Sequence, residues 1–106
     1  MEIGVIGFGR FGKLLTKYLS KDFKVYVFDK NNKKNEIKKI KAIPSTLETV
    51  SSKEIVILCT PISKIKEILK KVKSFVTKDT LVIDVCSVKE YPCKLMKEIL
   101  PKNVHI

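Results

Sequence analysis

One short glycine-rich stretch near the start of the chain limits its possible folds more than any other feature. An almost wholly apolar run of strand length, residues 3–6, leads directly into Gly7-Phe8-Gly9-Arg10-Phe11-Gly12. Apolar residues then recur at helical spacing, which predicts a helix. The residues predicted to form its buried stripe are Phe11, Leu14, Leu15, Tyr18 and Leu19. A G-x-G-x-x-G pattern is weak evidence alone, but between a strand and a helix it is specific for a tight strand–turn–helix unit.

The rest of the chain alternates between apolar runs of strand length and helical patterns. Further strands are predicted at residues 25–28, 40–43, 54–59, 81–83 and, as the start of a sixth, 104–106. Because these runs are apolar throughout, we expect them to be buried on both faces of a parallel sheet. The βαβα order predicts an α/β fold of the doubly wound Rossmann type. We expect one three-layer domain over residues 1–106, with strand order 3-2-1-4-5-6.

The segments between these strands carry helix signals of different strength. Residues 30–39 are polar and lysine-rich, which predicts a loop with one weak helical turn. Ser45 and Glu48 form a capping box, and a short helix is expected to begin there. Thr60 is predicted to cap the next helix, with Pro61 in its first position, where a missing N–H costs nothing. The buried stripe predicted for that helix is Ile62, Ile65, Ile68, Leu69 and Val72.

Each glycine of the turn has a predicted task. Gly7 permits the tight turn, Gly9 lets the backbone approach a ligand, and Gly12 lets the helix pack closely on the strand. Free N–H groups and the positive end of the helix then form a seat for the diphosphate of a dinucleotide. Arg10 either adds charge to this seat or is simply exposed. The residues predicted to bind the cofactor here are Gly7, Phe8, Gly9, Arg10, Phe11 and Gly12.

An acidic residue follows the second predicted strand in the register that a dinucleotide site requires. Asp29 lies 20 residues after Gly9, where a carboxylate accepts hydrogen bonds from the adenosine ribose. An acid that merely starts a turn explains the residue but not this register. The carboxylate would repel a 2′-phosphate, so we expect NAD to be preferred over NADP. Lys30 leaves NADP possible, because a lysine beside the acid can pair with that phosphate.

The carboxyl ends of the fourth and fifth predicted strands complete the expected site. Cys59, Thr60 and Pro61 end the fourth strand beside the first, at the crevice where the strand order reverses. The nicotinamide half is expected to pass these residues and to run on toward Ser87. For Thr60, a capping role and proximity to the cofactor are compatible.

The net charge of +11 comes almost entirely from lysine, with Arg10 as the sole arginine. Readers of nucleic acid usually combine arginine with exposed aromatic residues, so no nucleic-acid partner is expected. Lysines such as Lys64 and Lys71 lie between the apolar positions of one helix and are interpreted as its solvated face. A positive field can still attract anionic cofactors and substrates.

The remaining composition excludes several other classes. The three cysteines show no CxxC spacing, and His105 is a lone histidine, so neither a disulfide framework nor a metal site is expected. No apolar run approaches the roughly 20 residues that cross a bilayer. The first residues also lack the layout of a signal peptide. We expect a cytoplasmic protein without a membrane segment.

Three segments of the chain resemble the prephenate and arogenate dehydrogenases, oxidoreductases of tyrosine biosynthesis. They are residues 3–12, residues 59–61, and the sequence Asp84-Val85-Cys86-Ser87-Val88-Lys89-Glu90, which is followed by Leu100-Pro101. The resemblance runs through all 106 residues. It implies the cofactor half of an NAD-dependent dehydrogenase that oxidises and decarboxylates prephenate or arogenate.

The resemblance also implies roles for residues inside and outside the chain. Ser87 would lie between the nicotinamide and a catalytic histidine, as a supporting catalytic residue. That histidine belongs to a Thr-His-Pro motif after the sixth strand, and an arginine of a later helical domain binds the substrate carboxylate. Neither is present here, and His105 precedes the expected motif. We therefore expect the chain alone to be inactive and the full-length enzyme to be a homodimer.

Three other functions stay open from the sequence. An imine or keto-acid reductase would keep the fold and change the substrate, although the resemblance at residues 87–89 disfavours it. A stand-alone NAD(P)-binding sensor or partner module is a second alternative. A basic nucleic-acid module is the third, and it would show a steep salt dependence of DNA binding that dinucleotide does not compete away.

Overall fold

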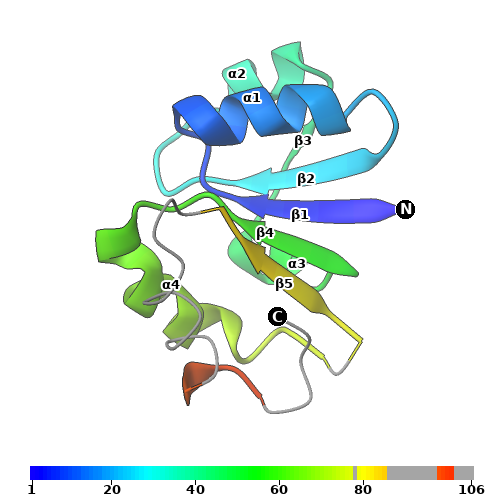
Figure 1. Cartoon of the computed structure of the whole chain (residues 1–106). Coiled ribbons are helices and arrows are strands. Elements are labelled where there is room, and N and C mark those ends of the chain that lie inside the picture. Colours follow the sequence, from blue (N-terminus) through cyan, green and yellow to red (C-terminus); the bar gives the residue numbers. More distant parts are fainter. Residues whose placement is uncertain (78, 86–97, 102–106) are drawn as a thin grey trace.

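A parallel sheet with the strand order β3-β2-β1-β4-β5 forms the centre of this computed structural model (Figure 1). The structure describes residues 1–77, 79–85 and 98–101. The strands are β1 (Glu2–Ile6), β2 (Lys24–Phe28), β3 (Ile43–Pro44), β4 (Ile55–Leu58) and β5 (Leu81–Asp84). The helices are α1 (Arg10–Leu19), α2 (Lys34–Lys39), α3 (Leu47–Ser51) and α4 (Ile65–Val72), the last preceded by a 3-10 turn, η1 (Ile62–Lys64). The predicted doubly wound fold is confirmed for these strands, whereas the predicted sixth strand at residues 104–106 lies outside the described residues.

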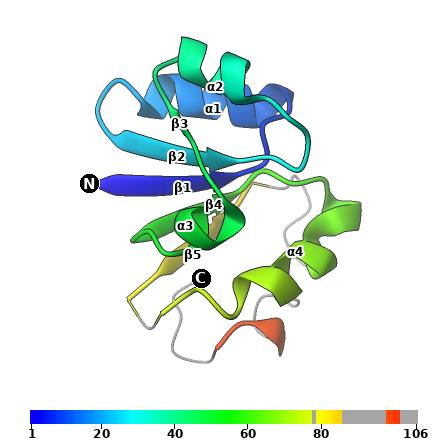
Figure 2. The same ribbon diagram turned by 180° about the vertical axis from the view of Figure 1, so that it is seen from behind.

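Helices cover both faces of the sheet and make three layers (Figures 1 and 2). On one face, α1 and α2 cover a cluster that includes Ile3, Val5, Val25, Val27 and Ile37. On the other face, α3 and α4 cover a second cluster, whose buried members include Ile6, Val50, Val56, Leu58, Ile65, Leu69, Val72 and Val82. β1 is hydrogen-bonded to β2 on one side and to β4 on the other. This central place explains why residues 3–6 of β1 are buried and almost wholly apolar.

The rotation of α1 about its axis differs from the prediction. Phe11, Leu14 and Tyr18 were expected to be buried, but they are 53%, 51% and 61% exposed. The helix instead turns Gly12 and Thr16 toward the sheet. A Cβ on Gly12 would overlap the carbonyl oxygen of Gly7, so the close contact at this glycine fixes which side of the helix meets the sheet. Leu15 and Leu19 pack against the core, as predicted.

The second helix is longer than the helical turn predicted there, and the third strand begins later than predicted. Residues 34–39 form α2 where a loop with a weak helical turn was expected, and the strand predicted at residues 40–43 is reduced to Ile43–Pro44. Lys41 has a φ of 63°, and the amide of Ala42 donates to the carbonyl of Ile37 at 3.2 Å. The left-handed conformation of Lys41 ends α2. The strand β3 begins only at Ile43, because residues 40–42 form the turn between the two elements.

Two predicted helix caps lie elsewhere in the structure. Thr46, not Ser45, caps α3, and its hydroxyl accepts a hydrogen bond from the amide of Thr49 at 3.2 Å. The Ser45 hydroxyl instead donates to the carbonyl of Ile43. The N-cap of α4 is Lys64 rather than Thr60, because the chain first makes η1 after Pro61. The predicted buried stripe of α4 is confirmed for Ile65, Leu69 and Val72, which are fully buried, with Ile68 partly buried.

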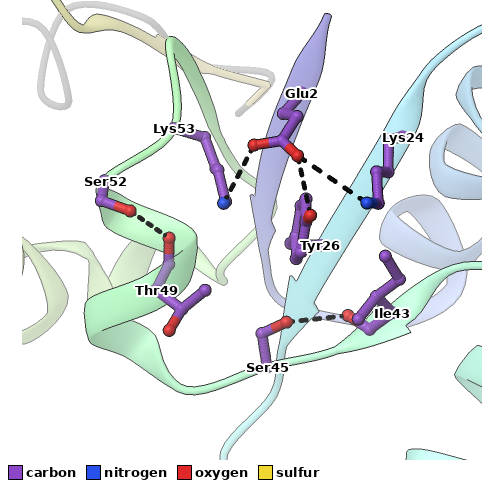
Figure 3. Close-up of polar contacts among 8 residues, drawn as sticks. All are labelled: Glu2, Lys24, Tyr26, Ile43, Ser45, Thr49, Ser52 and Lys53. Atoms are coloured by element: carbon purple, nitrogen blue, oxygen red, sulfur yellow. Dashed lines mark hydrogen bonds and ion pairs between the residues drawn. The ribbon is translucent and has the colours of Figure 1, made fainter.

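A polar network joins β1, β2 and the turn after α3 (Figure 3). The Glu2 carboxylate accepts hydrogen bonds from the Tyr26 hydroxyl at 2.8 Å and from the Lys53 ammonium at 3.1 Å. The same ammonium lies 3.8 Å from the centre of the Tyr26 ring, and Lys24 approaches Glu2 to 4.0 Å. Two hydrogen bonds, the larger contribution from Tyr26 and the smaller from Lys53, lower the pKa of the Glu2 carboxyl below its ordinary value of 4.5.

Candidate functional site

A cavity of about 600 Å³ lies at the carboxyl ends of β1, β2 and β4. This is the end of a doubly wound sheet at which ligands bind, beside the strands where the order reverses. The predicted site residues that line it are Gly7, Phe8, Gly9, Arg10, Phe11, Gly12, Asp29, Lys30, Cys59, Thr60 and Pro61. The structure therefore brings these residues together. Ser87, the remaining predicted site residue, lies outside the described residues.

The glycine turn is held tightly between its two neighbouring strands. Gly7 has a φ of 107°, a conformation that favours glycine. Its amide donates to the carbonyl of Phe28 at 2.8 Å, and an added Cβ would lie 2.7 Å from the carbonyl oxygen of Cys59. The turn is therefore locked to the ends of β2 and β4, where a side chain at Gly7 would not fit.

Gly9 is the glycine of the turn that faces open space. It is the N-cap of α1, and an added Cβ would meet no atom of the described part of the chain within 4 Å. The carbonyl of Gly9 accepts the amide of Lys13 at 2.9 Å, which begins the helix. The first turn contains no acidic residue, so the positive end of the helix is not neutralised from within. The residues present fit a diphosphate, because amides and open space meet at the same point.

Asp29 is fixed beside the turn by hydrogen bonds to both of its carboxylate oxygens. The amide of Phe8 donates to Oδ2 at 2.7 Å, and the amide of Asn31 donates to Oδ1 at 2.9 Å. The carboxylate thereby connects the end of β2 to the glycine turn. Each carboxylate oxygen has a further lone pair, so two ribose hydroxyls can still donate to this group.

Lys33 contacts the same residue of the turn, Phe8, and was not predicted from the sequence. Its ammonium donates to the carbonyl of Phe8 at 3.1 Å. Asp29 and Lys33 thus bind the N–H and the C=O of Phe8. Phe8 as a whole residue is only 2% exposed, so it fixes the turn and offers little surface to a ligand. Phe11 and Arg10 are exposed at the cavity.

A second wall of the cavity comes from β2, α3 and α4. Phe28, Leu47 and Ile68 line it with partly buried apolar surface, which suits one face of a planar ring. Lys64 and Lys71 also line the cavity, and both are exposed, as predicted for the solvated face of this helix. Their spacing with Ile68 on one side of α4 is the signal that could have identified this wall.

The end of β4 closes the cavity beside β1. The amide of Cys59 donates to the carbonyl of Ile6 at 2.8 Å, and the Thr60 hydroxyl donates to the same carbonyl at 3.4 Å. These bonds hold the β4 end against the glycine turn.

Within residues 1–77, 79–85 and 98–101, no cluster of histidine, cysteine or carboxylate side chains could hold a metal ion. No helix in that part of the chain is long and apolar enough to cross a membrane.

Comparison with known proteins relates this geometry to one family. The family model described as prephenate dehydrogenase, nucleotide-binding domain, matches residues 11–106. Arogenate dehydrogenase 1, chloroplastic, of Arabidopsis thaliana is 32% identical over 111 residues, which cover 100% of this chain and 17% of that protein.

Two solved structures share the fold. Synechocystis arogenate dehydrogenase superimposes with a TM-score of 0.83 at 24% identity, over 93% of this chain and 37% of the other. Prephenate dehydrogenase from A. aeolicus, solved in complex with hydroxyphenyl propionate and NAD+, gives a TM-score of 0.79 at 26% identity, over 98% of this chain and 40% of the other. The present chain thus spans less than half the length of these relatives. On the match to the family model, the chain belongs to the prephenate dehydrogenase nucleotide-binding domain family.

Proposed function

We propose that residues 1–106 are the NAD-binding domain of a dehydrogenase that oxidises and decarboxylates prephenate or arogenate. The observation that carries the proposal is the pairing of an open, cationic helix start at Gly9 with a fixed carboxylate at Asp29. Both line one cavity at the carboxyl ends of the strands. Family membership and the NAD+ complex of the A. aeolicus relative support the same cofactor.

Different residues of the cavity bind different parts of the dinucleotide. The amides at the start of α1 bind the diphosphate, with Gly9 giving it room to approach. The Asp29 carboxylate accepts hydrogen bonds from the adenosine ribose. Phe28, Leu47 and Ile68 hold the adenine on their apolar surface.

The nicotinamide half then extends past Thr60 toward Ser87. When bound, this ring supplies the carbon that accepts a hydride from the substrate. The end of β4 orients this ring, because Cys59 and Thr60 are both hydrogen-bonded to the carbonyl of Ile6 and are therefore held in place. The 106 residues contain no Thr-His-Pro sequence. We propose that the histidine and the substrate carboxylate site are supplied by the complete enzyme, as a homodimer in the cytoplasm.

Calorimetric titration with NAD+ and NADP+ tests the cofactor assignment directly. Wild type should bind NAD+ more tightly than NADP+, because Asp29 accepts the ribose hydroxyls and repels a 2′-phosphate. Asp29→Ser should narrow or reverse that preference. Asp22→Ser, which removes a carboxylate that does not line the cavity, should leave the ratio unchanged. Absence of dinucleotide binding to wild type would refute the proposed function, and equal affinities in wild type and Asp29→Ser would remove Asp29 from the site.

A further inference from the structure

Three large hydrophobic side chains form an exposed stripe along one side of α1. Phe11, Leu14 and Tyr18 are 53%, 51% and 61% exposed. Their spacing of three and then four residues aligns them over two turns of the helix. The helix packs on the sheet through Gly12 and Thr16, so packing within the domain does not account for the stripe. Single exposed hydrophobic residues are ordinary, whereas aligned ones mark a contact surface.

The sheet is uncovered on the same face beyond α1. Val5, Ile57 and Ile83 are register partners on β1, β4 and β5, so their side chains point to one face. Their exposure rises from 0% to 7% to 38% toward β5. On this face α1 covers β1 and β2, α2 covers β3, and no described helix covers β5 (Figure 1). Strands of a parallel sheet are normally covered on both faces, so β5 lacks a cover here.

The stripe is turned toward this uncovered part of the sheet. The Lys13 ammonium lies 4.0 Å from the Glu36 carboxylate of α2, so that side of α1 faces α2. Phe11 is two residues away, about 200° around the helix, and projects from the opposite side. Since α2 contacts β3 at one edge of the sheet and β5 lies at the other described edge, the stripe and Ile83 face the same space between α1 and the sheet.

Cations border the stripe on its outer side. Arg10, Lys17 and Lys21 recur at intervals of seven and four residues, which places them in one row along α1 and the turn after it. All three are exposed, and α1 contains no carboxylate. The Lys21 ammonium lies 5.1 Å from the centre of the Tyr18 ring, so the row adjoins the stripe. An apolar centre with a charged rim is typical of a protein–protein interface.

We propose that α1 and the uncovered face of β5 form a docking surface for an acidic amphipathic helix of another protein. This inference goes beyond the dinucleotide site and does not rest on it. A helix suits the surface because its apolar side chains recur at the same three- and four-residue spacing as the stripe. Its apolar side contacts the stripe and Ile83 together, and its carboxylates lie along the cation row.

The same features disfavour two other occupants. A second copy of this chain would bring one cation row against an identical one, and like charges across an interface are repulsive. A flat anionic membrane would meet the cation row of α1, but it would not reach Ile83, which lies on the sheet in the layer below the helix.

Fluorescence anisotropy with labelled synthetic peptides tests the docking surface. The probe is an amphipathic helix of about 18 residues, five turns, with leucine along one side and glutamate along its flanks. A matched peptide carries lysine at every glutamate position. Leu14→Gln, Tyr18→Gln and Ile83→Gln should each weaken binding of the glutamate peptide by about three- to tenfold, because a half-exposed apolar side chain is lost from the interface.

Two lysine variants test the cation row. Lys17→Gln should weaken binding of the glutamate peptide by about two- to fivefold at low salt and by less at high salt. Lys39→Gln removes an exposed charge from α2, away from the row, and should have little effect. Urea unfolding of each variant distinguishes a docking defect from a folding defect.

The remaining outcomes overturn the proposal. They are no binding of the glutamate peptide, equal binding of the lysine peptide, and unchanged binding by the three glutamine variants of the apolar surface. Sedimentation that shows a dimer lost in Leu14→Gln would assign the surface to a second copy, and binding to phosphatidylserine vesicles without binding to the peptide would assign it to a membrane. Leu14, Tyr18 and Ile83 do not line the dinucleotide cavity, so their variants should bind NAD+ as wild type does. Failure of wild type to bind NAD+ would refute the proposed function alone.

Discussion

Gly9→Ala should separate dinucleotide binding from folding. Gly9 has φ −77° and ψ −161°, an extended conformation that alanine adopts without strain. An added Cβ meets no atom of the residues that the structure describes within 4 Å. The methyl group therefore has room in the ligand-free domain, but it occupies the space through which we propose the diphosphate approaches the amides of α1.

The two expected effects differ in size. At a helix N-cap, alanine is worse than glycine by several tenths to about 1 kcal/mol. Alanine also restricts the unfolded chain more than glycine does, which stabilises the folded state by about 0.4–1 kcal/mol. Because these two effects oppose each other, the free energy of unfolding should change by less than about 0.5 kcal/mol. Hydrogen bonds from amides to a charged phosphate contribute about 1.5–3 kcal/mol each. Losing one of them weakens binding by roughly 10- to 150-fold.

Calorimetric titration with NAD+ and urea unfolding measure these two effects on the same preparations. Gly12→Ala and Gly4→Ala are the matched controls. A Cβ at Gly12 would overlap the Gly7 carbonyl, so both stability and binding should fall. A Cβ at Gly4 would overlap the Val50 carbonyl, away from the cavity, so stability should fall while the folded fraction binds normally. Wild-type NAD+ affinity in Gly9→Ala would refute the placement of the diphosphate.

Three further predictions concern folding. Leu14→Lys should change the free energy of unfolding by less than about 0.5 kcal/mol because the side chain is exposed. Leu69→Ala, at a buried position, should lower it by about 2–5 kcal/mol in urea unfolding. A loss of that size in Leu14→Lys would show that Leu14 is buried, as the helical spacing predicts. Thr16→Val should raise the unfolding midpoint by the equivalent of about 1 kcal/mol, because the Thr16 hydroxyl is buried and has no hydrogen-bond partner among the described residues; a lowered midpoint would show that this hydroxyl is hydrogen-bonded in solution. The contacts that lower the pKa of Glu2 stabilise the folded state above pH 4.5, and that contribution is lost as the pH falls through the folded-state pKa; the unfolding midpoints of wild type and Glu2→Gln should therefore converge on acidification.

The sheet was predictable from the sequence because its strands are defined locally. Apolar runs bounded by turn residues mark β1, β2, β4 and β5, and the glycine turn after residue 6 fixes which strand is central. The end of α2 was not predictable in this way. Lys41 adopts a left-handed conformation that no glycine or asparagine signals, and the strand after it was therefore placed too early.

The error in α1 had a different origin. Helical spacing alone allows a stripe through Phe11, Leu14 and Tyr18, because the hydrophobic residues occupy more of the helix than the sheet can cover. The deciding residue was Gly12, whose predicted task was close packing on the strand. A helix that presents Gly12 to the sheet must also present Thr16 one turn later. Combining the helical spacing with the predicted packing of Gly12 on the strand would have given the observed rotation of α1 about its axis.

The candidate site was predictable where its residues follow strand ends. Asp29 and residues 59–61 meet the glycine turn because parallel strands end at the same edge of the sheet. Lys33, Leu47 and Ile68 reach the cavity from a loop and two helices. For Lys33 and Leu47, this position depends on long-range packing that sequence spacing does not encode, whereas the spacing of Ile68 with Lys64 and Lys71 indicates a shared side of α4.

The excess of lysine has a local consequence at this site, and it can be tested by kinetics. The cations that line the main cavity are Arg10, Lys30, Lys33, Lys64 and Lys71, and its carboxylates are Asp29 and Glu67. A concave surface of one charge sign raises the rate at which an anion arrives, and salt screens this effect. Hydrogen bonds to the α1 amides act only after contact and govern dissociation.

Lys71→Met should therefore slow NAD+ association at low salt and leave dissociation nearly unchanged, whereas Gly9→Ala should mainly speed dissociation. Lys71 is exposed on α4 and pairs weakly with Glu67 at 3.8 Å, so its removal disturbs little of the packing. Stopped-flow binding at two ionic strengths measures both rate constants. If Lys71→Met acted on dissociation at both salt concentrations, the lysine would contact the bound dinucleotide, and the cationic wall of α4 would be a binding surface instead of a source of long-range attraction.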